Sequence, residues 1–92
     1  GETFAGLPFA KGVALSRELA WIGEGRGSMT EASMRWILDH PAITCVIPGF
    51  KNVRQVEHNL GAQRVPSFTD AELARLKAFY DQEVHSHIRG SY

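Results

Sequence analysis

The stretch MRWILDHPAITCVIPGFKNVRQVEHNL, from Met34 to Leu60, decides the fold to which this chain can belong. Its helix-forming start reaches Pro41, and a residue before proline is pushed out of the helical region, so a helix ends there. The run Ile43–Ile47 (ITCVI) is then continuously apolar and bounded by proline on both sides. Such a run is typical of a strand buried on both faces in a parallel sheet. We therefore predict a strand near 43–47, with Cys45 buried in it as a small hydrophobic residue.

Upstream of this strand, the sequence predicts two helices. Apolar residues at helical spacing indicate a first helix over about 13–22. After a glycine-rich break, a second helix is predicted to start at Ser28 or Thr30 and to end near Pro41. Ser28-x-x-Glu31 resembles a capping box, and Thr30 is an equally good N-cap. We expect Trp36, on the apolar stripe of this helix, to lie in the core.

Downstream of the strand, two more helices are predicted. Asn52 is a suitable N-cap for a helix that places Val53, Val56 and Leu60 on its inner face. Gly61 stands where a left-handed C-terminal glycine is expected. The capping box Thr69-x-x-Glu72 then opens a helix near 69–84.

The predicted elements do not make a complete fold. One clear strand among four helices has no hydrogen-bonding partner, and unpaired buried backbone groups are costly. The 92 residues are also about a third of the roughly 250 that a (β/α)8 barrel needs. We expect a mostly α-helical piece of an α/β protein that depends on more sheet than it supplies.

Composition argues against several classes of function. Ten basic and ten acidic side chains give zero net charge, which disfavours nucleic acid as a partner. A single cysteine allows no intrachain disulfide. No apolar run reaches the roughly 18 residues of a membrane span, and the N-terminus does not resemble a signal peptide. These observations favour a cytoplasmic location without a membrane partner.

A family resemblance extends over nearly the whole chain. The string R-W-I-L, D-H-P, V-I-P-G and Q-V-x-x-N-L is similar to the C-terminal end of the aldo-keto reductases, and the flanks GLPFAKGVALSREL and FTDAELARLKAFY are similar too. The resemblance implies that residues 1–92 are the C-terminal segment of a (β/α)8 TIM barrel. It places the last barrel strand near 43–47, a cofactor-binding loop and helix over 48–61, and a C-terminal helix near 69–84.

The resemblance also implies an activity, which is the reduction of aldehydes or ketones by hydride transfer from NADPH. In the family, the catalytic Tyr, Lys, Asp and His lie on strands upstream of the segment that this chain resembles. We therefore expect no catalytic residue among these 92 residues, and we expect the chain alone to be inactive. The implied partners are the remainder of the barrel, on the same or a separate chain, and a small carbonyl substrate. A metal site is not expected, because the i, i+2 spacing of His85 and His87 does not suit one helical face.

Carried over residue by residue, the family's contacts to the adenosine end of NADP(H) fall on Ile47, Pro48, Gly49, Phe50, Lys51, Gln55, His58 and Asn59. Lys51 corresponds to the partner of the 2′-phosphate, and Gln55 and Asn59 to groups that hydrogen-bond the phosphate, ribose and adenine. Phe50 occupies a position that is often small. His58 departs from the Glu that many members carry.

Local physical chemistry agrees with an anion at this place. Gly49 allows close approach of a ligand to the backbone, and the free N–H groups and dipole of the helix after Asn52 favour negative charge. Lys51 and Arg54 add positive charge beside that terminus. Structural alternatives stay open: both cations as solvated surface residues, and Gln55 as the partner of the Asn52 cap.

Two other functions remain as alternatives. The chain could be a non-enzymatic, truncated relative that self-associates as a helical module through apolar surface left without a barrel. A helix-turn-helix DNA-binding module is a distant third, because the net charge is zero.

Overall fold

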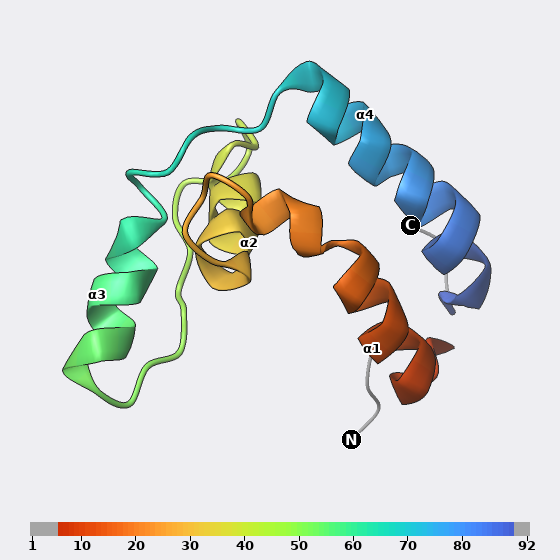
Figure 1. The fold of residues 1–92 in the computed structure, drawn as a ribbon, viewed down its shortest axis with the longest axis horizontal. Helices are drawn as coiled ribbons and strands as arrows, with labels where there is room; N and C mark the ends of the chain where they lie inside the picture. Colours follow the sequence, from red (N-terminus) through yellow and green to blue (C-terminus); the bar gives the residue numbers. More distant parts are fainter. Residues whose placement is uncertain (1–5, 90–92) are drawn as a thin grey trace. The chain divides into compact units, whose positions relative to one another are not determined.

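The computed structural model describes residues 6–89, which form two compact units. The central unit comprises Ala20–Phe68, and the terminal unit comprises residues 6–19 together with 69–89. Each unit is described by itself below. Figure 1 follows both along the chain.

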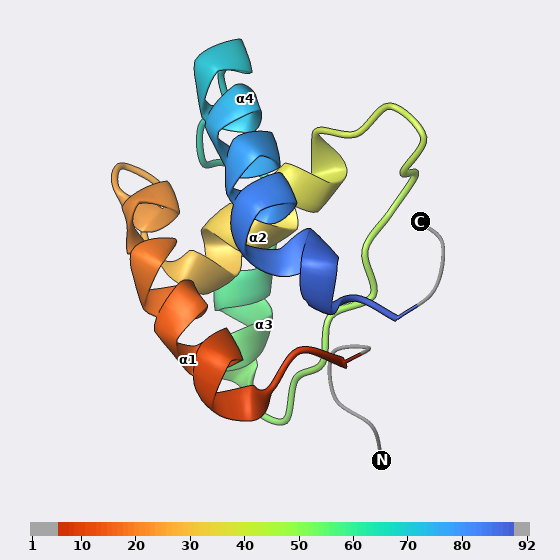
Figure 2. The ribbon, with the colours of Figure 1, turned by 90° about the vertical axis from the view of Figure 1, so that its right-hand side faces the viewer.

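The terminal unit contains α1 (Phe9–Glu18), α4 (Asp70–Phe79), the π-helical turn η3 (Tyr80–Val84) and the 3-10 helix η4 (His85–His87). Figure 2 shows α4, η3 and η4 as one continuous coil. An ion pair of 3.7 Å between Lys11 Nζ and Glu83 Oε2 joins α1 to η3. The predicted helix near 69–84 is therefore present, with π-helical geometry in its last turn.

The first helix differs from its predicted bounds. It starts at Phe9 rather than near residue 13, because Pro8 precedes it in an extended conformation with φ of −60° and sets the chain's entry into the helix. It ends at Glu18, and the remaining residues of the predicted helix form the separate 3-10 helix η2 (Ala20–Gly23).

The central unit contains η2, α2 (Met29–Leu38) and α3 (Val53–Gly61). Helix α2 packs against both η2 and α3. The core of the unit is small and consists of Ile22, Ala32, Met34, Ala62 and Phe68.

Gly61 has a different role from the one predicted. It is the last residue of α3, and Ala62 follows it in right-handed helical geometry, so no left-handed cap forms. Instead, a Cβ at Gly61 would collide with the Glu31 carboxylate of α2. The glycine therefore allows the C-terminal end of α3 to approach α2 closely.

The predicted N-caps are confirmed. Ser28 Oγ accepts a hydrogen bond from the Glu31 N–H at 3.3 Å, and Asn52 Oδ1 accepts from the Gln55 N–H at 2.9 Å. Thr69 and Glu72 complete both arms of the capping box of α4. These local signals fix where three of the helices begin.

The predicted strand is wrong. Residues 43–50 form an irregular segment between α2 and α3, and no strand occurs in residues 6–89 (Figure 1). Cys45 is exposed, and Ile47 keeps 94% of its surface. The physical reason is that a strand needs a neighbour for its N–H and C=O groups, and the described residues supply none. The fold described here is thus helical rather than α/β with one clear strand.

Two burial predictions for the helices are also wrong. Val53 and Leu60 of α3 are 72% and 53% exposed, and the half-buried residues of that helix are Gln55, Val56 and Asn59. Trp36 is 39% exposed, with its ring edge-on to His40 at 4.5 Å between centroids. These side chains are apolar and were therefore expected to be buried, but no helix or loop within residues 20–68 packs over them.

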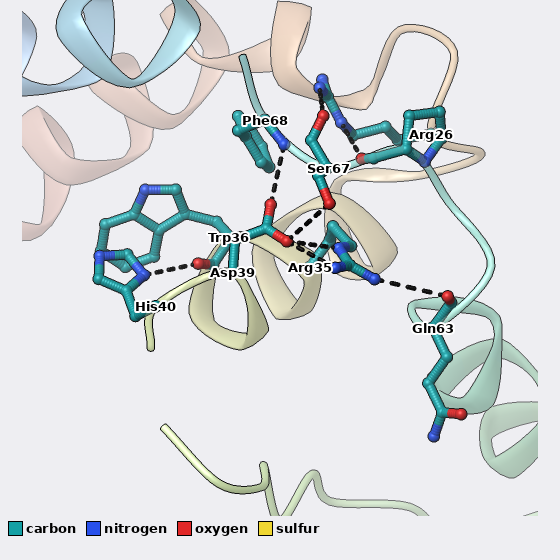
Figure 3. Close-up of polar contacts among 9 residues, drawn as sticks. Arg26, Arg35, Trp36, Asp39, His40, Gln63, Ser67 and Phe68 are labelled. Atoms are coloured by element: carbon teal, nitrogen blue, oxygen red, sulfur yellow. Dashed lines mark hydrogen bonds and ion pairs between the residues drawn. The ribbon is translucent and has the colours of Figure 1, made fainter. Parts of the chain in front are cut away.

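A cluster of polar side chains binds residues 62–68, the connector that follows α3 (Figure 3). Arg26, 5% exposed, donates from Nε to the Pro66 carbonyl at 2.9 Å and from Nη2 to the Ser67 carbonyl at 3.0 Å. Its guanidinium lies 4.0 Å from the centroid of the Phe68 ring. Buried guanidinium groups are stable only when paired and hydrogen-bonded, and this one is satisfied by backbone carbonyls and a ring face.

Asp39 holds the same connector from α2. Its carboxylate accepts hydrogen bonds from the Phe68 N–H at 2.8 Å and the Ser67 hydroxyl at 2.9 Å, and pairs with Arg35 Nη2 at 2.6 Å. Partial burial raises the pKa of Asp39, but the hydrogen bonds from Arg35, Phe68 and Ser67 and the Arg35 charge together lower it below 3.8. Asp39 therefore stays ionised and binds the connector as a carboxylate.

We predict that Asp39→Ala lowers the free energy of unfolding by about 2–3 kcal/mol, because it leaves the Phe68 N–H and the Nε and Nη2 groups of Arg35 without their acceptor. Urea unfolding followed by circular dichroism measures the loss. The control is Asp81→Ala, which removes an exposed pair with Lys77 and should cost no more than about 0.5 kcal/mol. Equal small losses for both variants would contradict the role given to Asp39.

The pKa of Asp39 also predicts how stability depends on pH. Because its pKa in the folded state lies below the unfolded value of 3.8, its contribution is complete well above pH 3.8 and disappears as the pH falls through the folded pKa. Unfolding measured from pH 7 to pH 3 should therefore show a steeper acid loss in the wild type than in Asp39→Asn. Identical pH profiles would show that the carboxylate gains nothing from its partners.

Candidate functional site

The candidate site residues lie on the segment 47–51 and on α3. Ile47, Phe50, Lys51 and His58 are exposed, whereas Pro48 is half-buried. Two hydrogen bonds bring the segment and the helix together. Asn59 Nδ2 donates to the Gly49 carbonyl at 3.2 Å, and the Lys51 N–H donates to Gln55 Oε1 at 2.7 Å.

The N-terminus of α3 has free donors. Asn52 satisfies the Gln55 N–H, while the N–H groups of Val53 and Arg54 have no acceptor within residues 6–89. The first turn of α3 carries no acidic residue, in contrast to Glu31 in α2 and Asp70 in α4. With free N–H groups and no neighbouring carboxylate in that turn, this end of α3 favours an anion.

Two cations lie at this helix end. Lys51 directly precedes the N-cap Asn52, and Arg54 is in the first turn of α3, whereas His58 lies in its last turn. Neither Lys51 nor Arg54 has an ion-pair partner in the part of the chain that the structure describes, whereas Lys11, Arg35 and Lys77 are paired. Exposed, unpaired cations beside free N–H groups favour an anion at this end of α3.

Gly49 leaves open space beside the segment. A Cβ built at this position meets no atom within 4 Å, so packing in the described structure does not require glycine here. The open side leaves room for a ligand to approach the backbone between Pro48 and Lys51.

A cavity of about 380 Å³ lies between α2, the segment 43–48 and α3. Its walls are mainly apolar, with the side chains of Met34, Leu38, Val46, Pro48 and Leu60, and Asn59 contributes a polar amide. Phe50 is not among its lining residues and instead remains 64% exposed. The structure therefore brings Pro48 and Asn59 together at one cavity but leaves Phe50 outside it.

Catalytic and metal-binding groups were not predicted on this chain. Tyr80 lies in η3 with its ring 5.8 Å from the His85 ring, and Tyr92 lies outside the described residues. Among residues 6–89, no three His, Cys, Asp or Glu side chains are grouped as a metal site would need.

None of the described helices is long and apolar enough to cross a membrane.

Comparison with known proteins identifies the family. The aldo/keto reductase family model matches residues 9–81, so this chain belongs to the aldo/keto reductase family. The chain is also similar to YqkF, an uncharacterized oxidoreductase of Bacillus subtilis (strain 168), with 31% identity over 58 residues. The match covers 63% of this chain and 19% of that relative, so it spans about a fifth of the relative's length. No solved structure gives a significant match.

The structure adds contacts that sequence reasoning missed. The bond from Asn59 to the Gly49 carbonyl joins residues ten positions apart and has no local sequence signal. The bond from the Lys51 N–H to Gln55 differs by one residue from a capping box, in which the N-cap N–H would be the donor. Its spacing could have indicated it.

We predict that Gly49→Ala leaves the free energy of unfolding unchanged or raises it by up to about 1 kcal/mol, because the site is open and alanine restricts the unfolded chain. Gly27→Ala is the matched control. Gly27 has φ of +80° and its Cβ would meet the Glu31 carboxylate, so this variant should lose about 1–2 kcal/mol. Chemical unfolding of both variants measures the difference, and a comparable loss in Gly49→Ala would show that residue 49 is constrained.

Proposed function

We propose that this chain supplies the adenosine-phosphate subsite of an NADP(H)-dependent aldo-keto reductase. The observation that carries the proposal is the N-terminus of α3, where free N–H groups of Val53 and Arg54 lie beside the unpaired cation Lys51. Family membership supports the oxidoreductase class. When bound, NADPH supplies the hydride for the reduction of an aldehyde or ketone.

The residues of this chain bind and orient one end of the cofactor. Phosphate oxygens accept from the free N–H groups, and the Lys51 ammonium pairs with the 2′-phosphate. The amide groups of Gln55 and Asn59 would hydrogen-bond the phosphate, ribose and adenine, and Phe50 is free to pack against the base because it is exposed. Ile47 and Pro48 provide apolar backbone beside it.

The remainder of the enzyme, on the same or another chain, supplies the catalytic groups and the substrate pocket. It also covers the apolar side chains that the central unit leaves exposed, which include Ile47, Val53 and Leu60. The 92-residue chain by itself therefore binds cofactor without reducing carbonyl compounds.

We predict that Lys51→Ala weakens NADPH binding by about ten- to a hundredfold, because a charge-assisted contact contributes roughly 1.5–3 kcal/mol. NADH lacks the 2′-phosphate, so its affinity should change little. Titration of the chain with each cofactor, followed by tryptophan fluorescence, gives both dissociation constants.

The matched control is Lys77→Ala, which removes an exposed lysine that pairs with Asp81 in the terminal unit. This variant should bind both cofactors like the wild type. Equal weakening of NADPH and NADH by Lys51→Ala would contradict the assignment of Lys51 to the 2′-phosphate. Failure of the wild type to bind either cofactor would contradict the subsite itself.

One observation favours a second candidate function, a non-enzymatic helical module that self-associates. Large apolar side chains at Ile47, Phe50, Val53 and Leu60 are more than half exposed. Exposed apolar surface of this kind favours association. A native mass measurement separates the two proposals, because a stable homo-oligomer that does not bind NADPH would support self-association, and a monomer would remove it.

A further inference from the structure

The two amide side chains that face the candidate site already have partners within the chain. Gln55 Oε1 accepts from the Lys51 N–H at 2.7 Å, and Asn59 Nδ2 donates to the Gly49 carbonyl at 3.2 Å. Both bonds connect α3 to the backbone of residues 49–51, and this backbone makes no other hydrogen bond within residues 6–89. The segment is thus fixed to the helix at two points.

We propose that Gln55 and Asn59 are positioning residues that hold residues 49–51 against α3, as a two-point latch. Without these bonds, the exposed segment between Gly49 and Lys51 has no packing that determines its place, since a Cβ at Gly49 would meet nothing and Phe50 is 64% exposed. The latch fixes the backbone of Lys51 beside the helix N-terminus and so reduces the conformational freedom that ligand binding must remove.

The latch also determines which amide atoms remain for a ligand. A backbone N–H only donates, so the atom of Gln55 that it meets is the oxygen, and the NH2 group is left to point elsewhere. The Gly49 carbonyl only accepts, so Asn59 uses an N–H of its amide and keeps its oxygen available. Gln55 therefore offers donors, which suit phosphate oxygens, and Asn59 offers an acceptor. This second part rests on the proposed function.

Isosteric substitutions test the latch, because the two residues use opposite atoms. Gln55→Glu keeps an oxygen acceptor for the Lys51 N–H and should leave the latch closed. Asn59→Asp has no donor at neutral pH and should release the Gly49 carbonyl. Gln55→Ala removes the acceptor and should release Lys51. The matched control is Gln63→Ala, whose side chain is exposed and makes no hydrogen bond in the described part of the chain.

Amide hydrogen exchange and carbonyl chemical shifts in the ligand-free chain give the readouts. We expect the Lys51 amide to exchange about two- to tenfold faster in Gln55→Ala, and at the wild-type rate in Gln55→Glu and Gln63→Ala. The Gly49 carbonyl-carbon shift should move in Asn59→Asp alone. Circular dichroism confirms that each variant keeps its helices. Unchanged Lys51 exchange in a folded Gln55→Ala, or an unmoved Gly49 shift in a folded Asn59→Asp, would overturn the latch.

A second arm uses adenosine 2′,5′-bisphosphate as the probe and tests the orientation of Gln55. Gln55→Glu should keep Lys51 protected and yet bind this probe at least about tenfold more weakly, because a carboxylate oxygen replaces the outward NH2 donor. Unchanged affinity would overturn the assigned orientation. A wild-type chain that does not bind the probe would contradict the proposed function, while the exchange results still decide the latch.

Discussion

The arrangement of the central unit depends on the Asp39 carboxylate. It stands at the C-terminal end of α2 and accepts the Phe68 N–H and the Ser67 hydroxyl, so it fixes the connector that leaves α3. Arg26 binds the same connector through the Pro66 and Ser67 carbonyls. Because the core of the unit contains few fully buried side chains, these hydrogen bonds contribute a large share of its stability.

As a consequence, the C-terminal end of α3 is fixed by packing and hydrogen bonds, while its N-terminal end remains exposed. At the C-terminal end, Gly61 lies against Glu31, Ala62 is buried, and Arg35 donates to the Gln63 carbonyl at 3.4 Å. At the N-terminal end, the N–H groups of Val53 and Arg54 remain unsatisfied within residues 6–89. A helix held this way offers its positive dipole end to an anion without having to reorganise.

Local signals in the sequence predicted the helices better than they predicted burial. The caps at Ser28, Asn52 and Thr69 depend on contacts three residues apart, and all three are present. The run 43–47 has the composition of a buried strand, but strand formation depends on partners that lie outside the local sequence, and residues 6–89 contain none. The same reason explains why Val53, Leu60 and Trp36, read as inner residues, are exposed.

The candidate site shows the same division. The resemblance and the residues predicted an anion-binding helix terminus after Asn52, and the free N–H groups and unpaired Lys51 are consistent with it. The sequence could not predict whether Gln55 and Asn59 use the oxygen or the NH2 group of their amides within the chain. That choice depends on whether each amide meets a backbone N–H or a backbone carbonyl. The polar cluster of Arg26 and Asp39 was missed for a similar reason, since its bonds to the connector join residues 28 to 41 positions apart.

An amide-resolved NMR titration of the 15N-labelled chain with adenosine 2′,5′-bisphosphate tests the phosphate site most directly. We predict the largest chemical-shift changes at the N–H groups of Val53 and Arg54, because they would donate to the phosphate. The N-termini of α2 and α4, which carry acidic residues in their first turns, serve as internal controls and should not respond. Shifts confined to those controls, or none at saturating probe, would contradict the claim that α3 presents a phosphate site.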